Sequence, residues 1–206
     1  MVPNRDFSGN WLGGLWKSGL SGECLRAVSA PQPASTSFAR YNVAVTFVIR
    51  EFKPADFETL WRVDQECFPP GIAYSKQEIK SYVRHRGAFT LLAVDAGVAS
   101  SAGKDAAAKN SGNAAGFIVV HGGPAGHVIT IDVVAAARRL GVGSLLLQAA
   151  EDRLRAAGSR AVSLETAVDN LAALAFYKRH GYSVVRTWPR YYPNGVDALV
   201  MKKDLP

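Results

Sequence analysis

Cysteine is scarce in this sequence, which holds only Cys24 and Cys67 among its 206 residues. Two cysteines cannot build the disulfide framework of a small secreted domain. Neither cysteine stands in a C-x-x-C or Cys/His spacing of the kind that holds a metal ion. We therefore expect two reduced thiols in a cytoplasmic protein that binds no metal.

Long apolar runs and concentrated charge are also missing. A membrane-spanning helix needs about 20 predominantly apolar residues, and the longest candidate is interrupted by Asp132 and by the pair Arg138 and Arg139. The net charge of +7 is scattered along the chain, and no zinc-finger spacing, RNP aromatic motif or basic zipper occurs. We expect a soluble protein with an anionic partner, without membrane insertion or direct nucleic-acid binding.

Regular periodicity is absent from residues 1–42, which are rich in Gly, Ser, Pro and Ala. We expect a disordered extension there; an organelle transit peptide is the alternative, because the segment holds few acidic residues. Residues 43–206 are expected to form one domain around a single core. Inside this domain, the low-complexity stretch 95–115 predicts a flexible loop between neighbouring strands.

The remaining sequence alternates strand and helix patterns. Apolar residues fall at helical intervals within 53–68, and Ser75 with Glu78 has the spacing of a capping box that opens a second helix. A longer helix is expected over 143–157, with the buried stripe Leu145, Leu146, Ala149, Ala150 and Leu154. A short helix is expected from 169 or 170 to about 180. Strands are expected at 45–52, 88–94, 116–122, 127–134, 160–168, 182–188 and 197–203, the third and fourth being antiparallel. This order predicts a mixed α/β sheet with helices on its faces.

A glycine-containing turn joins the strand that ends at Val134 to the longer helix. Gly141-x-Gly143 at a helix start offers backbone N–H groups and the positive end of the helix dipole, which suits a phosphate. A Cβ at either glycine would keep an anion off the backbone, and Arg138 and Arg139 add charge and donors. The plain alternative is a tight turn with solvated arginines.

Two familiar phosphate motifs do not fit this turn. A P-loop needs a lysine after its last glycine, whereas Ser144 follows Gly143 directly. A dinucleotide turn places its first glycine against the strand and a third small residue where Leu146 stands. Glu165 lies at a spacing suited to ribose binding, so a dinucleotide site stays open as an alternative. The spacing that does fit is Arg138-x-x-Gly141-x-Gly143.

At these residues the chain resembles the GNAT acyltransferase superfamily, whose pyrophosphate loop has the pattern Q/R-x-x-G-x-G/A. Residues 163–182 look like that family's strand, its Asn-x-x-Ala helix and a Tyr before Gly-Tyr/Phe. The ending 190–205 is similar to the RimI-type subgroup, which acetylates N-termini of ribosomal proteins and closes with Tyr-Tyr-Pro, a turn and an acidic-Ala-x-x-Met strand. The resemblance implies a single domain whose mostly antiparallel sheet is splayed at the cofactor site, with helices on both faces.

The resemblance also implies the reactants and their residues. Acetyl-CoA would be the donor and the α-amine of a protein N-terminus, ribosomal proteins included, the acceptor. Glu165 would be the general base and Tyr177 the general acid, while Tyr191 and Tyr192 would cover the peptide. The first helix and the loop 67–75 would form the opposite wall, although this loop departs in detail from the subgroup's pattern. The cofactor would contact Val133, Val134, Arg138, Arg139, Gly141, Val142, Gly143, Ser144 and Asn170.

The chemistry of transfer favours an α-amine as acceptor. An α-amine with a pKa of about 8 loses its proton near pH 7.4 at a cost of about 1 kcal/mol, against about 4 for lysine. A carboxylate such as Glu165 is a sufficient base for the former. Two other functions stay open: acetylation of a small amine, and a module that binds CoA without turnover.

Several residues also have structural alternatives. Tyr177 fits a core aromatic and Asn170 a helix N-cap. Three histidines, His121, His127 and His180, lack ligand spacing and are expected to be ordinary surface or strand residues. Cys67 lacks a histidine motif that would mark a catalytic nucleophile.

Overall fold

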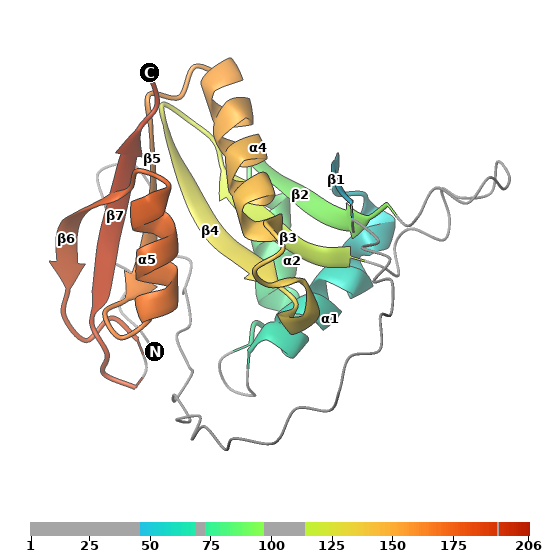
Figure 1. Cartoon of the computed structure of the whole chain (residues 1–206), viewed down its shortest axis with the longest axis horizontal. Coiled ribbons are helices and arrows are strands. Elements are labelled where there is room, and N and C mark those ends of the chain that lie inside the picture. Colours follow the sequence, from blue (N-terminus) through green and yellow to red (C-terminus); the bar gives the residue numbers. More distant parts are fainter. Residues whose placement is uncertain (1–45, 69–72, 97–113, 193) are drawn as a thin grey trace, which may run out of the picture.

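The computed structural model describes residues 46–68, 73–96, 114–192 and 194–206. The expected disordered extension over 1–42 and most of the expected loop over 95–115 lie outside these ranges. The described chain forms one seven-stranded sheet with the order β1-β2-β3-β4-β5-β7-β6, and helices cover both of its faces (Figure 1). The fold expected from the sequence is thereby confirmed.

The strand pairings explain why the sheet opens in the middle. The antiparallel series β1 to β4 comprises Phe47–Glu51, Ala88–Asp95, Ala114–His121 and Ala125–Val133. The second group comprises β5 (Ala161–Ala167), β6 (Ser183–Trp188) and β7 (Ala198–Asp204), again antiparallel. The two groups meet through the parallel pair β4 and β5, whose ladder runs only from Ala125 and Ala161 to His127 and Ser163. Beyond His127 the two strands diverge, as Figure 1 shows, and this splay makes room for a site.

The helices divide between the two faces. On one face α1 (Phe57–Cys67), preceded by the short 3-10 turn η1 (Pro54–Asp56), and α2 (Lys76–Arg84) pack on the first group of strands. The expected capping box opens α2: Glu78 N donates to Ser75 Oγ and Ser75 N donates to Glu78 Oε2. On the other face lie α4 (Val142–Ala156) and α5 (Leu171–Arg179), whose buried side chains share one core.

The buried stripe of α4 differs from the expected one at several positions. Ala149 is only partly buried, and Val142 and Glu151 are buried in addition. Leu145 is 44% exposed, whereas Leu147 is fully buried. Successive helical residues are about 100° apart, so Leu145 and Leu147 lie on opposite flanks of Leu146. The sheet lies on the Leu147 side of the helix. The sequence does not reveal this side, because a leucine stands on each side of Leu146.

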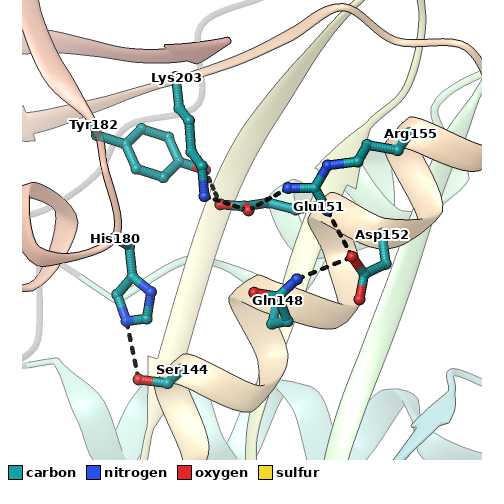
Figure 2. Close-up of polar contacts among 8 residues, drawn as sticks. All are labelled: Ser144, Gln148, Glu151, Asp152, Arg155, His180, Tyr182 and Lys203. Carbon is teal, nitrogen blue, oxygen red and sulfur yellow. Dashed lines mark hydrogen bonds and ion pairs between the residues drawn. The ribbon is translucent and has the colours of Figure 1, made fainter. Parts of the chain in front are cut away.

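A buried carboxylate ties α4 to the second group of strands (Figure 2). Glu151 Oε1 accepts from Tyr182 Oη at 3.1 Å, and Oε2 accepts from Lys203 Nζ at 2.6 Å and Arg155 Nη2 at 3.2 Å. A buried charge is tolerated only with such partners. This cluster, Glu151 with Arg155, Tyr182 and Lys203, fixes α4 between β4 and β7 and so positions its N-terminus.

Candidate functional site

The turn between β4 and α4 has the backbone that an anion site needs. After the 3-10 turn η3 (Ala135–Ala137), the chain passes through two positive φ values, +64° at Arg139 and +87° at Gly141. Gly141 is the N-cap of α4 and contributes no side-chain cap. The first N–H groups of a helix have no partner inside it, so those of Val142, Gly143 and Ser144 are available to a ligand.

This turn is one wall of a pocket of about 880 Å³. Of the expected cofactor residues, Val134 alone does not line it, and instead packs between the two cores. Three arginines, Arg138, Arg139 and Arg179, line it. The further lining residues are Cys67 and Phe68 of the α1 end, Ile131 to Val133 of β4, Ala137, Gly141 to Ser144, and Asp169 to Ala173 with Phe176.

Two lining residues, Gly143 and Asn170, lie at the N-termini of α4 and α5. A Cβ on Gly143 would lie 3.4 Å from the Phe176 ring. Asn170 is the N-cap of α5, since its Oδ1 accepts from Ala173 N at 3.1 Å. The N-cap role is therefore confirmed, and the amide NH2 group of Asn170 is the part that can serve a ligand.

His180 was expected to be an ordinary residue, but it contacts the turn. Its Nε2 lies 2.9 Å from Ser144 Oγ (Figure 2). Burial, and then the charge of Arg179, lowers the pKa of His180, so the imidazole is neutral near pH 7. The contact holds the Ser144 hydroxyl at the helix N-terminus. The sequence carries no signal for it, because the two residues are 36 positions apart.

Glu165 on β5 pairs with a second histidine that the sequence analysis set aside. His127 Nε2 lies 3.0 Å from Glu165 Oε2, and its Nδ1 lies 3.1 Å from Ser163 Oγ. Both His127 and Glu165 are 13% exposed at their side chains. The contact follows from the register, since His127 is opposite Ser163 and Glu165 is two residues further on the same face of β5. Glu165 is not among the residues that line the pocket.

The three expected tyrosines lie near these groups, at different depths. Burial, followed by the charge of Glu165, raises the pKa of Tyr191 above its ordinary value. Tyr192 is buried beside Tyr191, with ring centroids 5.2 Å apart. Tyr177 is fully buried and packs on Tyr182 and Phe176. Burial holds the pKa of Tyr177 well above 10, which keeps the phenol protonated, but its side chain does not line the pocket.

Asp132 is the residue that the sequence analysis missed. It lines the pocket from β4 while only 1% exposed. Its Oδ1 accepts from Thr130 Oγ1 at 2.7 Å, and its Oδ2 has no hydrogen-bond partner within the described ranges. Burial raises the pKa of Asp132 to about 8. The signal for a site residue in the sequence was a carboxylate inside an otherwise apolar strand. In the sequence it was used only as an interruption of a hydrophobic run.

Cys67 also lines the pocket, at the C-terminal end of α1. Burial, and then the charge of Asp132, raises the pKa of Cys67 to about 12. The thiol is therefore neutral near pH 7, unlike the thiolate that acts as a nucleophile. The described residues contain no cluster of three or more His, Cys, Asp or Glu arranged for a metal ion. None of the described helices is long and apolar enough to span a membrane.

Known proteins resemble this chain in sequence and in fold. The chain spans about half the length of the curated relatives it matches: N-alpha-acetyltransferase 30 of Schizosaccharomyces pombe is 38% identical over 74 residues, which are 36% of this chain and 49% of that protein. The ribosomal-protein-S18-alanine N-acetyltransferase from Escherichia coli superposes with a TM-score of 0.65 at 20% identity, covering 78% of this chain and 94% of that chain. A structure of the NatC complex bound to Gag peptide and CoA gives a TM-score of 0.63 at 22% identity, covering 78% and 99%. At such identities the structures show the fold alone. The sequence profile of the Acetyltransferase (GNAT) family matches residues 57–182, more than half of the chain, and by this match the protein belongs to the GNAT acetyltransferases.

Proposed function

We propose that this protein transfers the acetyl group of acetyl-CoA to the α-amine of a protein N-terminus. The observation that carries the proposal is the pocket at the splay of β4 and β5. Three arginines and a helix N-terminus, which suit a pyrophosphate, line this pocket. The end of β4 that is no longer paired with β5 lines it as well. Membership of the family provides the reaction class.

In the proposed complex the CoA pyrophosphate lies at the turn. Backbone N–H groups of Val142, Gly143 and Ser144 bind it, with Arg138 and Arg139 supplying positive charge. Beyond His127 the ladder of β4 to β5 has ended, so backbone groups of β4 face the splay. These groups, including the N–H of Val133, can pair with the amides of the pantetheine arm. They also offer a donor for the thioester oxygen.

The acceptor peptide is proposed to lie under Tyr191 and Tyr192. Both tyrosines lie near Glu165, whose charge contributes to raising the pKa of each. The relatives act on N-termini according to their names, among them the alanine N-acetyltransferase of a ribosomal protein. A ribosomal protein with a small first residue is therefore the acceptor class proposed for this chain.

Glu165 and Tyr177 are proposed to move the protons. Glu165, held by His127, takes a proton from the incoming ammonium group so that the neutral amine attacks the thioester. Tyr177 gives its proton to the departing thiolate. Burial, with a contribution from the charge of Asp132, raises the pKa of Tyr177 and keeps this proton on the phenol until it is transferred.

A module that binds CoA without turnover is the second candidate. It is favoured by two observations, the pairing of Glu165 with His127 and the burial of Tyr177 away from the pocket surface. A small amine as acceptor has no comparable observation in its favour.

The test offers acetyl-CoA with three acceptors: a peptide with a free Ala or Ser N-terminus, the same peptide N-blocked with an internal lysine, and a polyamine. We expect the free N-terminus to give the highest kcat/KM. Gly143→Val, whose side chain would meet Phe176, serves as the control that loses CoA binding. A better rate with the blocked peptide or the polyamine would contradict the acceptor class, and tight CoA binding without any transfer would favour the non-catalytic module.

A further inference from the structure

Acetyl transfer removes two protons from the attacking nitrogen, which begins as an ammonium group and ends as an amide N–H. In the function proposed above, on which this inference rests, Glu165 accepts the first of these protons. Tyr177 donates a proton to the thiolate and is left as a phenolate. The second proton of the nitrogen therefore needs an acceptor in the pocket, and Tyr177 needs a proton in return.

Two carboxylates line the pocket, and of these Asp132 is buried whereas Asp169 is exposed. Asp132 lines the pocket while almost completely buried, and its Oδ2 has no hydrogen-bond partner in the described part of the chain. Glu165 differs on both points, because it pairs with His127 at 3.0 Å and does not line the pocket. A buried carboxylate oxygen without a hydrogen-bond partner costs free energy, and active sites are where such groups are found.

Polar and charged groups on the same strand, on α1 and on the turn act on Asp132. The hydrogen bond from Thr130 on the same strand and the charge of Arg138 lower its pKa, while the charge of Asp64 on α1 raises it. Burial is the largest cause and brings the pKa to about 8. The other titratable groups affected by its charge are Cys67 of α1, Tyr74 before α2 and Tyr177 of α5.

The second proton differs from the first in acidity. It leaves after the nitrogen–carbon bond has formed, when the nitrogen is more acidic than the free α-ammonium group. A carboxylate can accept it, and the raised pKa makes Asp132 a stronger base than an ordinary aspartate. Return of the proton to Tyr177 is favourable, because burial holds the pKa of that phenol well above 10.

We propose that Asp132 is a further catalytic residue of this site, which accepts the second proton from the attacking nitrogen and passes it to the phenolate of Tyr177. The nitrogen–carbon bond forms and the carbon–sulfur bond breaks. The thiolate takes the Tyr177 proton, and Tyr177 regains one from Asp132. The proton on Glu165 leaves to solvent, so one proton is released for each acetyl group transferred.

The test compares pH profiles of kcat/KM for the peptide with a free N-terminus. Asp132→Asn should lower kcat about 100-fold or more, with the Kd for CoA within about twofold of the wild type.

Thr130→Val removes the hydrogen bond that lowers the Asp132 pKa, so the rising limb of the profile should move to higher pH. The pKa of the amine is the same in both proteins, so a shift reports a group of the enzyme. The matched control is Thr90→Val, which removes a buried hydroxyl from β2, two strands away, and should leave the limb in place.

A readout without activity follows the carboxyl group directly. Difference infrared spectra of the apo protein should show a protonated carboxyl band that titrates near pH 8 and is missing in Asp132→Asn. The native state holds this proton above the pKa of the unfolded chain, so wild-type stability falls as pH rises from about 4 to about 8. Asp132→Asn should therefore raise Tm more at pH 8.5 than at pH 5.

The outcomes separate this inference from the proposed function. If wild type acetylates the peptide while Asp132→Asn keeps full kcat, or if Thr130→Val leaves the limb in place, Asp132 is not the acceptor and the proposed function stands. If wild type binds CoA but acetylates none of the amines, both proposals are wrong. Loss of activity in Asp132→Asn with a titrating band and a shifted limb in Thr130→Val supports the inference.

Discussion

Two carboxylates on neighbouring strands of the sheet show how surroundings set the chemistry of a residue. Glu165 has a histidine partner, whereas Asp132 is buried with one oxygen accepting from Thr130 and the other without a partner among the described residues. Burial raises the pKa of Asp132 to about 8. The residue type alone does not distinguish a partnered carboxylate from one that faces a pocket.

Arg138 gives the prediction at the scale of single residues. Its Nε donates to Val133 O at 3.0 Å, which holds the guanidinium at the pocket. Arg138→Ala should weaken CoA binding by about 1–3 kcal/mol, the loss of a charge-assisted hydrogen bond, measured by titration calorimetry. Arg160→Ala, which removes an exposed arginine outside the pocket lining, is the control. Equal weakening by both variants would mean that only net charge matters.

At the scale of elements, the ends of helices build much of the pocket. The N-terminus of α4 supplies backbone N–H groups, the N-cap of α5 supplies Asn170, and the C-terminal end of α1 supplies Cys67 and Phe68. The start of α2 supports the same region, because Tyr74, immediately before its N-cap, donates its N–H to Asp64 Oδ2 of α1 at 2.7 Å.

The capping box of α2 gives the prediction at this scale. Ser75→Ala removes the acceptor for Glu78 N and should lower the free energy of unfolding by about 1 kcal/mol, as measured by urea denaturation. Ser81→Ala, an exposed serine inside the same helix, should leave stability unchanged or raise it slightly, because alanine has the higher helix propensity. If both serines gave the same result, the capping box would contribute nothing.

At the scale of the whole molecule, the two groups of strands are joined weakly at β4 and β5, since that ladder covers only Ala125 to His127 on β4. The cluster around Glu151 adds a second connection, from α4 to β7 and Tyr182. The splay can therefore stay open for a ligand while α4 keeps its position relative to both groups.

Lys203 gives the prediction for this connection. Lys203→Met leaves the buried Glu151 with Arg155 and Tyr182 as its partners, and should lower the free energy of unfolding by about 2 kcal/mol, below the 3–5 seen when a buried pair loses its single partner. The neighbouring Lys202 pairs with Asp204 at side chains that are 45% and 82% exposed. Lys202→Met should therefore change stability by less than about 0.5 kcal/mol. Both variants are measured by thermal and urea unfolding. If Lys202→Met lowered stability as much as Lys203→Met, a structural role of the cluster would be contradicted.

Local patterns in the sequence were sufficient for the elements and for the phosphate turn. The strand alternation, the spacing of Ser75 and Glu78 and the Gly141-x-Gly143 turn each depend on neighbours within a few residues, and the structure has all of them. Most of the expected cofactor residues fall on one pocket for the same reason, since the turn and the N-cap of α5 are local features. Their roles in catalysis and binding remain predictions.

The tertiary structure alone decided which distant side chains meet. His127 and Glu165 are brought together by the pairing of β4 with β5, and Ser144 and His180 by the packing of α4 beside α5. Leu147 replaced Leu145 in the buried stripe because the flank of a helix that faces the sheet depends on how the helix docks. The state of Asp132 depends in the same way on its burial and on the charges of Asp64 of α1 and Arg138 of the turn. Periodicity records which residues are apolar, but desolvation and long-range contacts exist only after the chain has folded.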